Sequence, residues 1–304
     1  MNQLRYGHNS TIITKSLVVG VEIGIPSPEG YIPVIPKYVS CKNSAWKKGT
    51  ISFCRILSEY GPNGILNAMR ESGMKLTYDP IYRAHMVYIS LDDIIEYNNP
   101  KKLFEKYIFH EYKNIDPIVY RILEEILDDI DIKYVGLTGS YSLGMQNNFS
   151  DIDIVIYKEK NAENILKSFL SKTQIIECKN NFGGVLVEGP CLSWRRGRIF
   201  NKELSWTGIP SEISGNCPLL RDYRKIRIPT YINTITIKVD EGQPSALVYP
   251  PCVKDENGRY IVSFEYNTAY LLYTGGNLIV SGLYNGGSLF IGTREYPGYV
   301  KRKV

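Results

Sequence analysis

One segment in the middle of the chain constrains its fold more than any other part of the sequence. The pair Gly139-Ser140 follows a short apolar run, and Asp151 and Asp153 stand one residue apart at the start of a second, strongly apolar run. Successive side chains of a β-strand point to opposite faces, so the two aspartates project from one face while the isoleucines beside them enter a core. The segment predicts a strand, a Gly-Ser turn with a short helix, and then an acidic strand.

The aspartates and the Gly-Ser pair together point to nucleotide chemistry. Two carboxylates on one face repel each other unless a cation lies between them, and Asp151 and Asp153 offer the hard oxygen ligands that suit Mg²⁺ or Mn²⁺. Backbone N–H groups after Gly139, with the hydroxyl of Ser140, suit a polyphosphate. Either feature alone is more often structural, as solvated charges or a simple helix cap, so the predicted metal-dependent nucleoside triphosphate site depends on their combination.

The same residues carry a resemblance to a known family. Thr138–Gly144 and Ser150–Asp153 resemble the signature of the DNA polymerase beta-like nucleotidyltransferase superfamily, a Gly-Ser pair followed by Ser-Asp-x-Asp on a strand. The whole chain is similar to predicted archaeal nucleotidyltransferases in which this motif lies between two less familiar segments. The resemblance implies a Mg²⁺- or Mn²⁺-dependent enzyme that moves a nucleoside monophosphate from a nucleoside triphosphate to an acceptor and releases pyrophosphate.

Metal-dependent transfer of this kind usually needs a third acid on a neighbouring strand, close to the metal that activates the nucleophile. We favour Glu203, because alternation places Leu204 and Trp206 in the core of a short strand and Glu203 on the other face. This strand also resembles the third-acid strand of the family, which follows a basic, glycine-containing segment and more often carries Asp. Three other acids keep the assignment open: Glu177, Glu188 and Asp240.

A cluster of arginines precedes the strand of Glu203. Arg195, Arg196 and Arg198 lie within four residues of one another, and guanidinium groups match the geometry of phosphates. We predict that Arg195 and Arg196 bind the nucleotide. The alternative is that the cluster forms a solvated face, which is the commoner role of such a run.

Composition and charge exclude some classes of protein. The chain has 304 residues and a net charge of +5, which permits contact with nucleic acid without requiring it. It has no apolar run as long as a membrane span and no signal-peptide pattern, so we expect a cytoplasmic protein with no membrane partner. The expected partners are a nucleoside triphosphate and an acceptor, namely RNA, a protein or a small molecule. The sequence leaves the base, the acceptor and the oligomeric state open.

The six cysteines are scattered along the chain and include no C-x-x-C pair. This spacing argues against a zinc site. Buried thiols are the expectation, and a disulfide between Cys178 and Cys191 is the alternative that stays open.

These features predict an α+β protein in three parts. A nucleotidyltransferase-like catalytic core with a mixed sheet is expected over residues 115–222. A strand-rich N-terminal α+β segment over residues 1–114 and a C-terminal β-rich domain over residues 223–304, a small barrel or sandwich, flank this core.

Local patterns predict elements within these parts. In the N-terminal part, Tyr31–Val39 is expected to be an edge or bent strand because it contains two prolines, and Ser90–Glu96 a short capped helix. In the core, helices are expected over Pro100–His110 and Pro117–Ile130 and after a cap at Asn161. Beyond these helices, residues 175–188 are expected to form a hairpin, with a helix as the alternative.

Two other functions stay open from the sequence. One is a nucleotide-binding regulator that keeps the fold but not the turnover, since the pattern does not fix the third acid. The other is a nucleic-acid-binding module, because the C-terminal tyrosines offer stacking surfaces. Half-buried strand positions use tyrosine just as readily, and we favour that reading of these residues.

Overall fold

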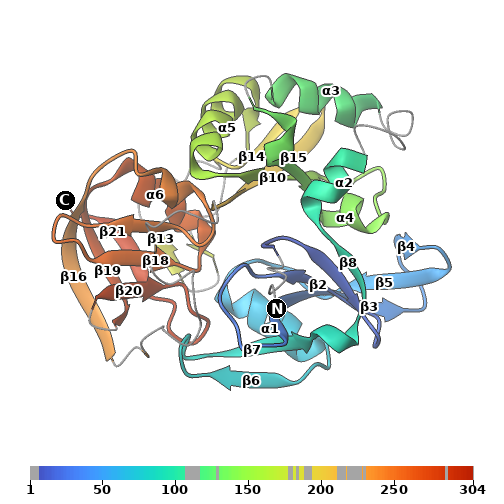
Figure 1. Cartoon of the computed structure of the whole chain (residues 1–304), viewed down its shortest axis with the longest axis horizontal. Helices are drawn as coiled ribbons and strands as arrows, with labels where there is room; N and C mark the ends of the chain where they lie inside the picture. Colours follow the sequence, from blue (N-terminus) through green and yellow to red (C-terminus); the bar gives the residue numbers. More distant parts are fainter. Residues whose placement is uncertain are drawn as a thin grey trace.

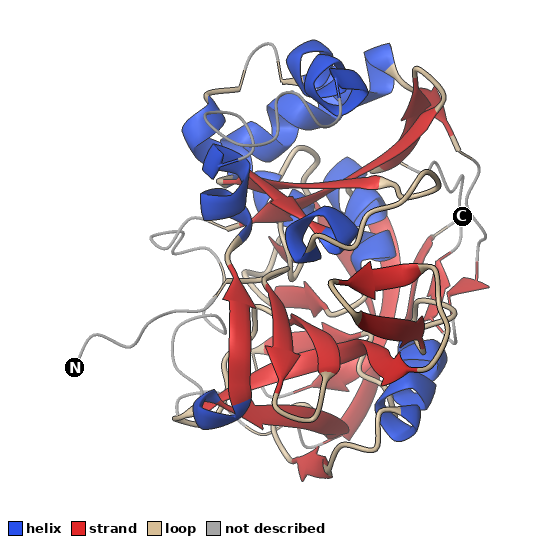
Figure 2. Ribbon diagram, turned by 90° about the vertical axis from the view of Figure 1, so that its right-hand side faces the viewer, coloured by secondary structure: helices blue, strands red, loops and turns tan. Residues whose placement is uncertain are grey.

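Three β-sheets arranged around a common centre make up the described part of the chain. The computed structural model describes residues 7–106, 117–127, 130–176, 181–182, 185–187, 194–210, 217, 228, 231–284 and 287–303. Figure 1 shows the N-terminal sheet in blue, the central sheet in green and yellow above it, and the C-terminal sheet in orange beside both. Figure 2 shows helices gathered over the central sheet, while strands dominate elsewhere. The structure confirms a mixed α+β fold.

The N-terminal sheet is antiparallel. Its strands are β1 (Thr11–Thr14), β2 (Val18–Glu22), β3 (Tyr31–Cys41), β4 (Trp46–Lys48), β5 (Ile51–Arg55), β6 (Leu76–Asp79), β7 (Ala84–Ser90) and β8 (Ile94–Asn98). They lie in the order β4-β5-β3-β2-β1-β8, with β7 also paired to β3 and β6 paired to β7. The helix α1 (Pro62–Glu71) packs on β3 and β7 with Ala68 and Met69 buried, and the sequence patterns missed it.

β3 lies in the middle of this sheet, so of the two predicted alternatives, an edge or a bent strand, the edge strand is wrong. It pairs with β2 along one side, and along the other side first with β7 and then with β5. Pro36 has no N–H to donate, and the register of β2 shifts between Val19 and Gly20, opposite this proline. On the other side, Lys37 lies between the two partner strands, where its carbonyl accepts a hydrogen bond from the N–H of Ile56.

The prediction of a helix over Ser90–Glu96 is also wrong. Ser90 caps only a single 3-10 turn, Leu91–Asp93, by accepting a hydrogen bond from the N–H of Asp92. The chain then continues as β8, which pairs with β1. β8 includes two isoleucines and a tyrosine, whose side chains favour a strand.

The central sheet carries the acidic strand. Its strands are β9 (Val135–Thr138), β10 (Ile152–Tyr157), β11 (Gln174–Ile175), β14 (Arg196–Ile199) and β15 (Lys202–Ile209). They lie in the order β11-β14-β15-β10-β9, with β10 parallel to β15 and antiparallel to β9. The helices of this part are α2 (Pro100–Lys106), α3 (Pro117–Ile126), α4 (Gly139–Leu143) and α5 (Glu159–Lys172).

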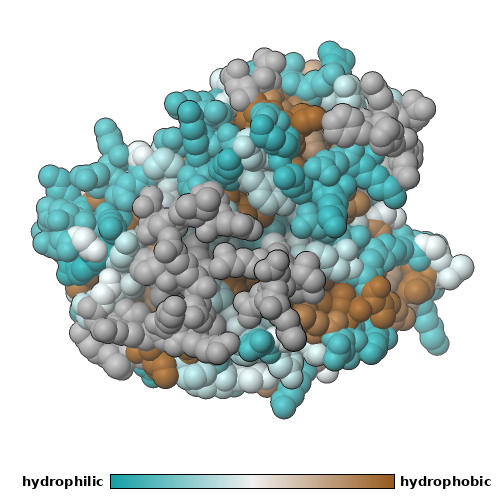
Figure 3. All heavy atoms as spheres, in the orientation of Figure 1, coloured by the Kyte–Doolittle hydropathy of each residue, from teal (hydrophilic) through white to brown (hydrophobic). Residues whose placement is uncertain are grey.

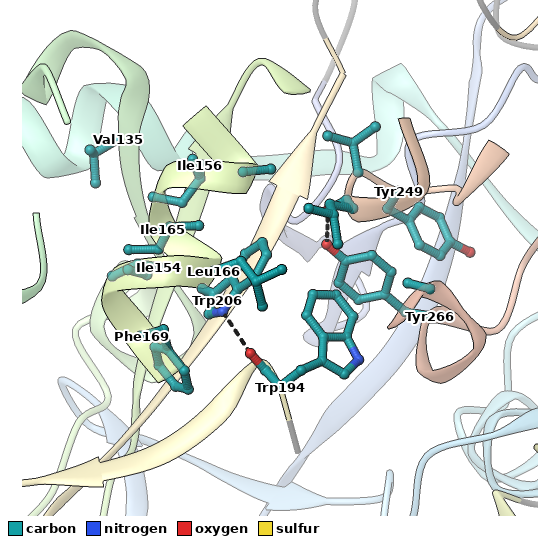
Figure 4. Packing of buried hydrophobic residues seen from close by; sticks show 14 of the residues in the cluster. Val135, Ile154, Ile156, Ile165, Leu166, Phe169, Trp194, Trp206, Tyr249 and Tyr266 are labelled. Carbon is teal, nitrogen blue, oxygen red and sulfur yellow. Dashed lines mark hydrogen bonds between the residues drawn. The ribbon is translucent and has the colours of Figure 1, made fainter. Parts of the chain in front are cut away.

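One face of the central sheet buries the largest apolar cluster. α3 and α5 pack side by side and contribute their apolar stripes to it. Figure 4 shows Ile154 and Ile156 of β10 beside Ile165, Leu166 and Phe169 of α5. The acidic strand is therefore anchored by the isoleucines on the side that faces away from its aspartates.

Two of the three predicted helix starts in this region are confirmed. Asn99 caps α2 by accepting a backbone hydrogen bond of 3.0 Å, and α3 begins at Pro117. α5 begins at Glu159, before the predicted cap, and Asn161 instead donates its side-chain N–H to the carbonyl of Tyr157. The predicted end of α2 lies outside the described residues. Among the described helices, none has the length and apolar character needed to cross a membrane.

The C-terminal sheet has mixed strand directions. Its strands are β12 (Asn181–Phe182), β13 (Val185–Val187), β16 (Tyr231–Val239), β17 (Cys252–Lys254), β18 (Tyr260–Ser263), β19 (Gly276–Tyr284), β20 (Ser288–Ile291) and β21 (Tyr299–Arg302). They lie in the order β12-β13-β21-β19-β20-β18-β17, and β16 pairs with β19. An isolated bridge between Val239 and Asp255 brings the end of β16 to the end of β17. The helix α6 (Ala269–Thr274) adds buried leucines to the core of this unit.

Among the described residues, the hairpin predicted over residues 175–188 is seen in its second half. β12 and β13 pair with each other, and β13 joins β21 of the C-terminal sheet. Ile175 instead ends β11, which pairs with β14 in the central sheet. The chain therefore passes from the central sheet to the C-terminal sheet and back again within this stretch.

Gly208 joins the central sheet to the C-terminal unit. A parallel bridge links it to Val248, and its carbonyl accepts a hydrogen bond of 2.9 Å from the N–H of Tyr249. Its own N–H donates to the hydroxyl of Tyr266 at 2.8 Å, and that hydroxyl donates to the carbonyl of Leu247. Figure 4 shows the two tyrosines side by side at this joint.

Hydrogen bonds also tie the N-terminal sheet to the helix that follows the Gly-Ser turn. The hydroxyls of Thr11 and Ser142 lie 2.7 Å apart. The ammonium group of Lys48 donates to the carbonyl of Leu143 at 3.0 Å. The N-terminal sheet therefore touches the segment that the sequence marks as functional.

Two disulfides correct the expectation of buried thiols. Cys41 of β3 is bonded to Cys54 of β5, and Cys217 is bonded to Cys252 of β17. The pairing follows from strand neighbours and tertiary contacts, which bring the Cα atoms of each pair within bonding range. The pair considered from the sequence, Cys178–Cys191, lies outside the described residues.

Gly208→Ala should weaken the joint between the central sheet and the C-terminal unit. A Cβ on Gly208 would lie 2.3 Å from the carbonyl oxygen of Leu247, so the backbone must move. We expect the free energy of unfolding to fall by about 1–3 kcal/mol, as at other overpacked sites, in chemical denaturation. Gly287→Ala is the control, because a Cβ there meets no atom within 4 Å. Equal losses in both variants would contradict the assignment.

Candidate active site

The Gly-Ser turn lies directly against the acidic strand. Gly139 follows β9 with a φ of +67°, a conformation that glycine adopts without steric cost. Thr138 pairs with Asp153 across β9 and β10. A Cβ on Gly139 would lie 2.3 Å from Asp153 Oδ2. Both the backbone conformation and this close approach require glycine, so the aspartate packs on the turn itself.

Asp151 and Asp153 stand on the face of β10 that is turned away from the helices. Ile152 and Ile154 are buried on the opposite face, whereas both aspartates are only partly buried. The hydroxyl of Ser205 donates a hydrogen bond to Asp153 Oδ1, and Ser205 is the partner of Asp153 in β15. No sequence pattern indicates Ser205, because its place depends on the register between two strands far apart in the chain.

The charges of the two carboxylates oppose each other. The pKa of Asp151 lies above its usual value of 3.8, because the side chain is buried and because the charge of Asp153 is close. The positive charges of Lys37 and Arg196 oppose this rise. A divalent cation between the carboxylates would stabilise their charged forms. The donor set of two carboxylates therefore fits a hard cation such as Mg²⁺ or Mn²⁺.

Lys37 brings a positive charge from the N-terminal sheet to this face. Its ammonium group lies 5.6 Å from the centre of the Tyr60 ring. Burial alone would lower the pKa of Lys37, but Tyr60 and Asp153 raise it above its usual range. Lys37 is therefore charged beside the aspartates. Sequence reasoning missed it because only the fold brings the charge of Lys37 within range of Asp151 and Asp153.

Ser140 is buried, and among the described residues its hydroxyl has no hydrogen-bond partner. The hydroxyl of Ser142, by contrast, contacts the hydroxyl of Thr11 and donates to the carbonyl of Gly139 at 2.8 Å. Buried polar groups nearly always have partners, so Ser140 keeps hydrogen-bonding capacity for a ligand. α4 spans only five residues, and the hydroxyl therefore matters more here than a helix dipole.

Glu203 lies on the same face of the sheet as the aspartates. The parallel ladder of β10 and β15 begins with Ile152 opposite Leu204, and Asp151 and Glu203 are the residues just before this pair. Its carboxylate is bound by two arginines of β14, with Arg198 Nη2 at 2.9 Å and Arg196 Nη2 at 3.4 Å. Within the described ranges, no three His, Cys, Asp or Glu side chains gather in a way that would hold a metal ion. Glu203 is thus next to the aspartates but occupied by other partners.

Two other residues considered for the site, Arg195 and Asp240, lie elsewhere. The guanidinium of Arg195 lies over the ring of Tyr266 at 5.0 Å, so it faces the C-terminal unit. Asp240 is an exposed residue that follows β16 in the C-terminal sheet. Two further candidates for the third acid lie outside the described residues: Glu177 and Glu188.

An aromatic pair borders the acidic strand. Phe149 is 69% exposed although it lies close to Asp151 in the chain, and its ring meets that of Trp46 edge-on, with centroids 5.5 Å apart. Figure 3 shows apolar side chains gathered over the N-terminal sheet, on the right of the view.

Ser150 forms local hydrogen bonds with Asn147, which hold the loop before the aspartates.

One comparison with known proteins bears on this site. Residues 119–188 match the nucleotidyltransferase domain family. The match begins in α3, ends just after β13 and includes the Gly139-Ser140 turn and both aspartates of β10. No curated protein and no solved structure matches the chain. The middle of the chain thus carries a nucleotidyltransferase domain, which indicates a transferase and nucleotidyl transfer in general.

Proposed function

We propose that this chain is a metal-dependent nucleotidyltransferase. An acceptor oxygen attacks the α-phosphorus of a nucleoside triphosphate, the nucleoside monophosphate is transferred, and pyrophosphate leaves. The acceptor would be RNA, a protein or a small molecule. The observation that carries the proposal is the packing of Asp153 on the Gly139 turn, beside Asp151 and the unpartnered hydroxyl of Ser140. The family match over residues 119–188 supports it.

Asp151 and Asp153 would hold Mg²⁺ or Mn²⁺. When bound, a divalent ion would stabilise negative charge on the attacking and the leaving oxygen atoms. The hydrogen bond from Ser205 and the contact with Gly139 fix the carboxylate of Asp153 in place. Asp151, whose pKa is raised by burial and by its neighbour, gains most from a nearby cation.

Ser140 and Arg196 would bind the triphosphate. The buried hydroxyl of Ser140 has no partner in the part of the chain that the structure describes, so it can bond a phosphate oxygen without breaking a bond seen there. The positive charge of Arg196 acts on Asp151, which places the arginine near the predicted metal. The nucleotide-binding role of Arg195 stays a prediction, since its guanidinium lies over Tyr266.

Glu203 would serve as the third carboxylate once its arginines are engaged elsewhere. It is bound by Arg196 and Arg198, and like Asp151 it comes just before the first pair of the β10–β15 ladder. Phosphate oxygens compete well for guanidinium groups, because such pairs form two parallel, charge-assisted hydrogen bonds. Binding of the triphosphate would therefore draw the arginines away and free Glu203 for the metal or for the proton of the acceptor.

A second candidate function is a nucleotide-binding regulator without turnover. The observation that favours it is the pair of arginine contacts that occupy Glu203, together with the lack of a three-acid cluster in the described residues. This candidate predicts tight, metal-dependent triphosphate binding with no release of pyrophosphate. Calorimetry combined with an assay for pyrophosphate separates it from the enzyme.

Replacing either aspartate should abolish transfer. Asp151→Asn and Asp153→Asn keep the side-chain shape but remove the charge that would hold a divalent cation. We expect transfer of label from triphosphates radiolabelled at the α-phosphate, with Mg²⁺ or Mn²⁺ and with pooled RNA and metabolites as acceptors, to fall at least about a hundredfold.

Asp240→Asn is the matched control for these two variants. It makes the same chemical change on an exposed residue of the C-terminal sheet and should keep full activity. Circular dichroism should show that all three variants are folded. Transfer that survives the double change of Asp151 and Asp153 would rule out the proposed function.

Ser140→Ala should weaken triphosphate binding without weakening the fold. The hydroxyl has no partner to lose among the described residues, but a hydrogen bond to a charged phosphate would disappear. We expect the Kd measured by calorimetry with Mg²⁺ to rise about tenfold. In Ser142→Ala, which loses its contacts with Thr11 and Gly139, we expect the opposite: lower stability by about 1 kcal/mol and unchanged affinity. A loss of affinity in Ser142→Ala alone would contradict the assignment of Ser140.

Glu203→Gln should lower turnover while it leaves nucleotide binding intact. We expect kcat to fall about a hundredfold and KM for the triphosphate to change little, because the residue would act on the reacting groups and not on the bound substrate. Glu241→Gln, an exposed acid next to the end of β16, is the control. Full turnover in Glu203→Gln would show that the third carboxylate is another residue.

A further inference from the structure

A cavity of about 40 Å³ lies where the N-terminal sheet meets the C-terminal unit, and it is partly open to solvent. Ile35, Ile65 and Met86 line it from the N-terminal side, and Phe264 and Arg294 line it from the C-terminal side. None of the residues assigned above to nucleotide chemistry contributes to its walls. It is therefore a site separate from the acidic strand.

Arg294 brings a positive charge to this cavity, and its hydrogen-bonding groups are poorly matched. Its Nη1 lies 2.6 Å from the sulfur of Met86, and a thioether sulfur is a weak acceptor. Its buried Nε has no hydrogen-bond partner among the described residues. The neighbouring Glu295 is turned toward His85, where Oε1 accepts from the backbone N–H at 2.8 Å and lies 2.7 Å from Nδ1. Across the part of the chain that the structure describes, Arg294 makes no ion pair with a carboxylate.

Glu265, the acid that also lines the cavity, has other partners. Burial raises the pKa of its carboxyl group, whereas Asn267 and the charge of Arg195 oppose this rise. Its Oε1 accepts hydrogen bonds from the backbone and side-chain N–H groups of Asn267. Burial also lowers the pKa of Arg294, and the nearby Tyr249, Glu295 and Tyr88 only partly oppose this fall. One end of an apolar cavity therefore carries a guanidinium that, within the described residues, no carboxylate contacts directly.

We propose that this cavity binds a small monocarboxylate, with the carboxylate on Arg294 and a short apolar body against Ile35, Ile65 and Phe264. Guanidinium and carboxylate groups pair through two parallel hydrogen bonds, which fix the ligand's orientation. A singly charged anion suits the site better than a phosphate dianion, because one cation balances one charge and any surplus buried charge is costly.

The size of the cavity sets the length of the ligand. A buried water needs roughly 10–15 Å³ of such space, so the cavity takes about three groups of this size. A carboxylate with a chain of a few carbons, such as butyrate, matches this volume. Because the two walls come from different sheets, a bound ligand would also stabilise the contact between the N-terminal and C-terminal units.

The test titrates the full chain with butyrate. Butyramide, which has the same shape but no charge, is titrated as the control ligand. Isotope-labelled methionine methyl groups report binding by NMR, because Met86 contacts Arg294 and is one of only five methionines. Met86→Leu assigns its signal. We expect butyrate to shift this signal saturably, with Kd on the order of 1 mM, and butyramide to bind at least about tenfold more weakly.

Two variants locate the site. Arg294→Gln should weaken butyrate binding at least about tenfold. Arg121→Gln is the control. Arg121 is an exposed arginine of α3 whose guanidinium lies over the ring of Phe200, and this variant, which loses the same charge, should bind butyrate as the natural chain does. If Arg294→Gln fails to fold, Ile65→Phe, which narrows the cavity but keeps the charge, should abolish the shift of the Met86 signal.

Several outcomes would overturn the proposal. These are equal binding of butyrate and butyramide, full butyrate binding by a folded Arg294→Gln, tighter binding of inorganic phosphate than of butyrate, or no saturable shift of the Met86 signal. The readout involves neither nucleotide nor metal. Its failure would therefore leave the proposed nucleotidyl transfer standing, and failure of transfer would leave this site standing.

Discussion

The contact between Gly139 and the carboxylate of Asp153 is the constraint on which the rest of the site depends. The glycine has a positive φ and no room for a Cβ, so the turn fits only when β9 and β10 keep their register. Ser205 fixes the same carboxylate from the other neighbouring strand. A shift of β10 by one residue would point its isoleucines at the turn and its aspartates into the core. The fold and the chemistry of the site therefore depend on one register.

Local periodicity was enough to predict β10 and α3. Alternation predicted the buried isoleucines of β10, and three- and four-residue spacing predicted the stripe of α3, because both depend only on neighbours in the chain. Long-range contacts were not predictable in this way. The central place of β3, the approach of Lys37 to the aspartates and the two disulfides depend on strands that meet only in the folded chain. Glu203 shows both cases: alternation predicted its face, but its arginine partners follow from the pairing of β14 with β15.

The N-terminal and C-terminal sheets both contact the central sheet or the turn next to it. The N-terminal sheet contacts the helix after the Gly-Ser turn and contributes Lys37 to the acidic face. The C-terminal unit binds the end of β15 at Gly208, on the same strand that carries Glu203. Each outer unit thus contacts a strand or turn that positions a proposed site residue. A change at either joint is expected to affect the site through the backbone.

The charges on the acidic face allow substrate binding without leaving any of them unbalanced. Cationic side chains from β3 and β14 lie among the carboxylates of β10 and β15, so the face is close to balanced without a ligand. A metal–triphosphate complex brings a cation for the aspartates and anions for the arginines. Binding under the proposed function is then an exchange of partners, in which every carboxylate and every guanidinium keeps an opposite charge. Such an exchange avoids the penalty of an unpaired buried charge, and it explains why arginines that occupy Glu203 are compatible with a working site.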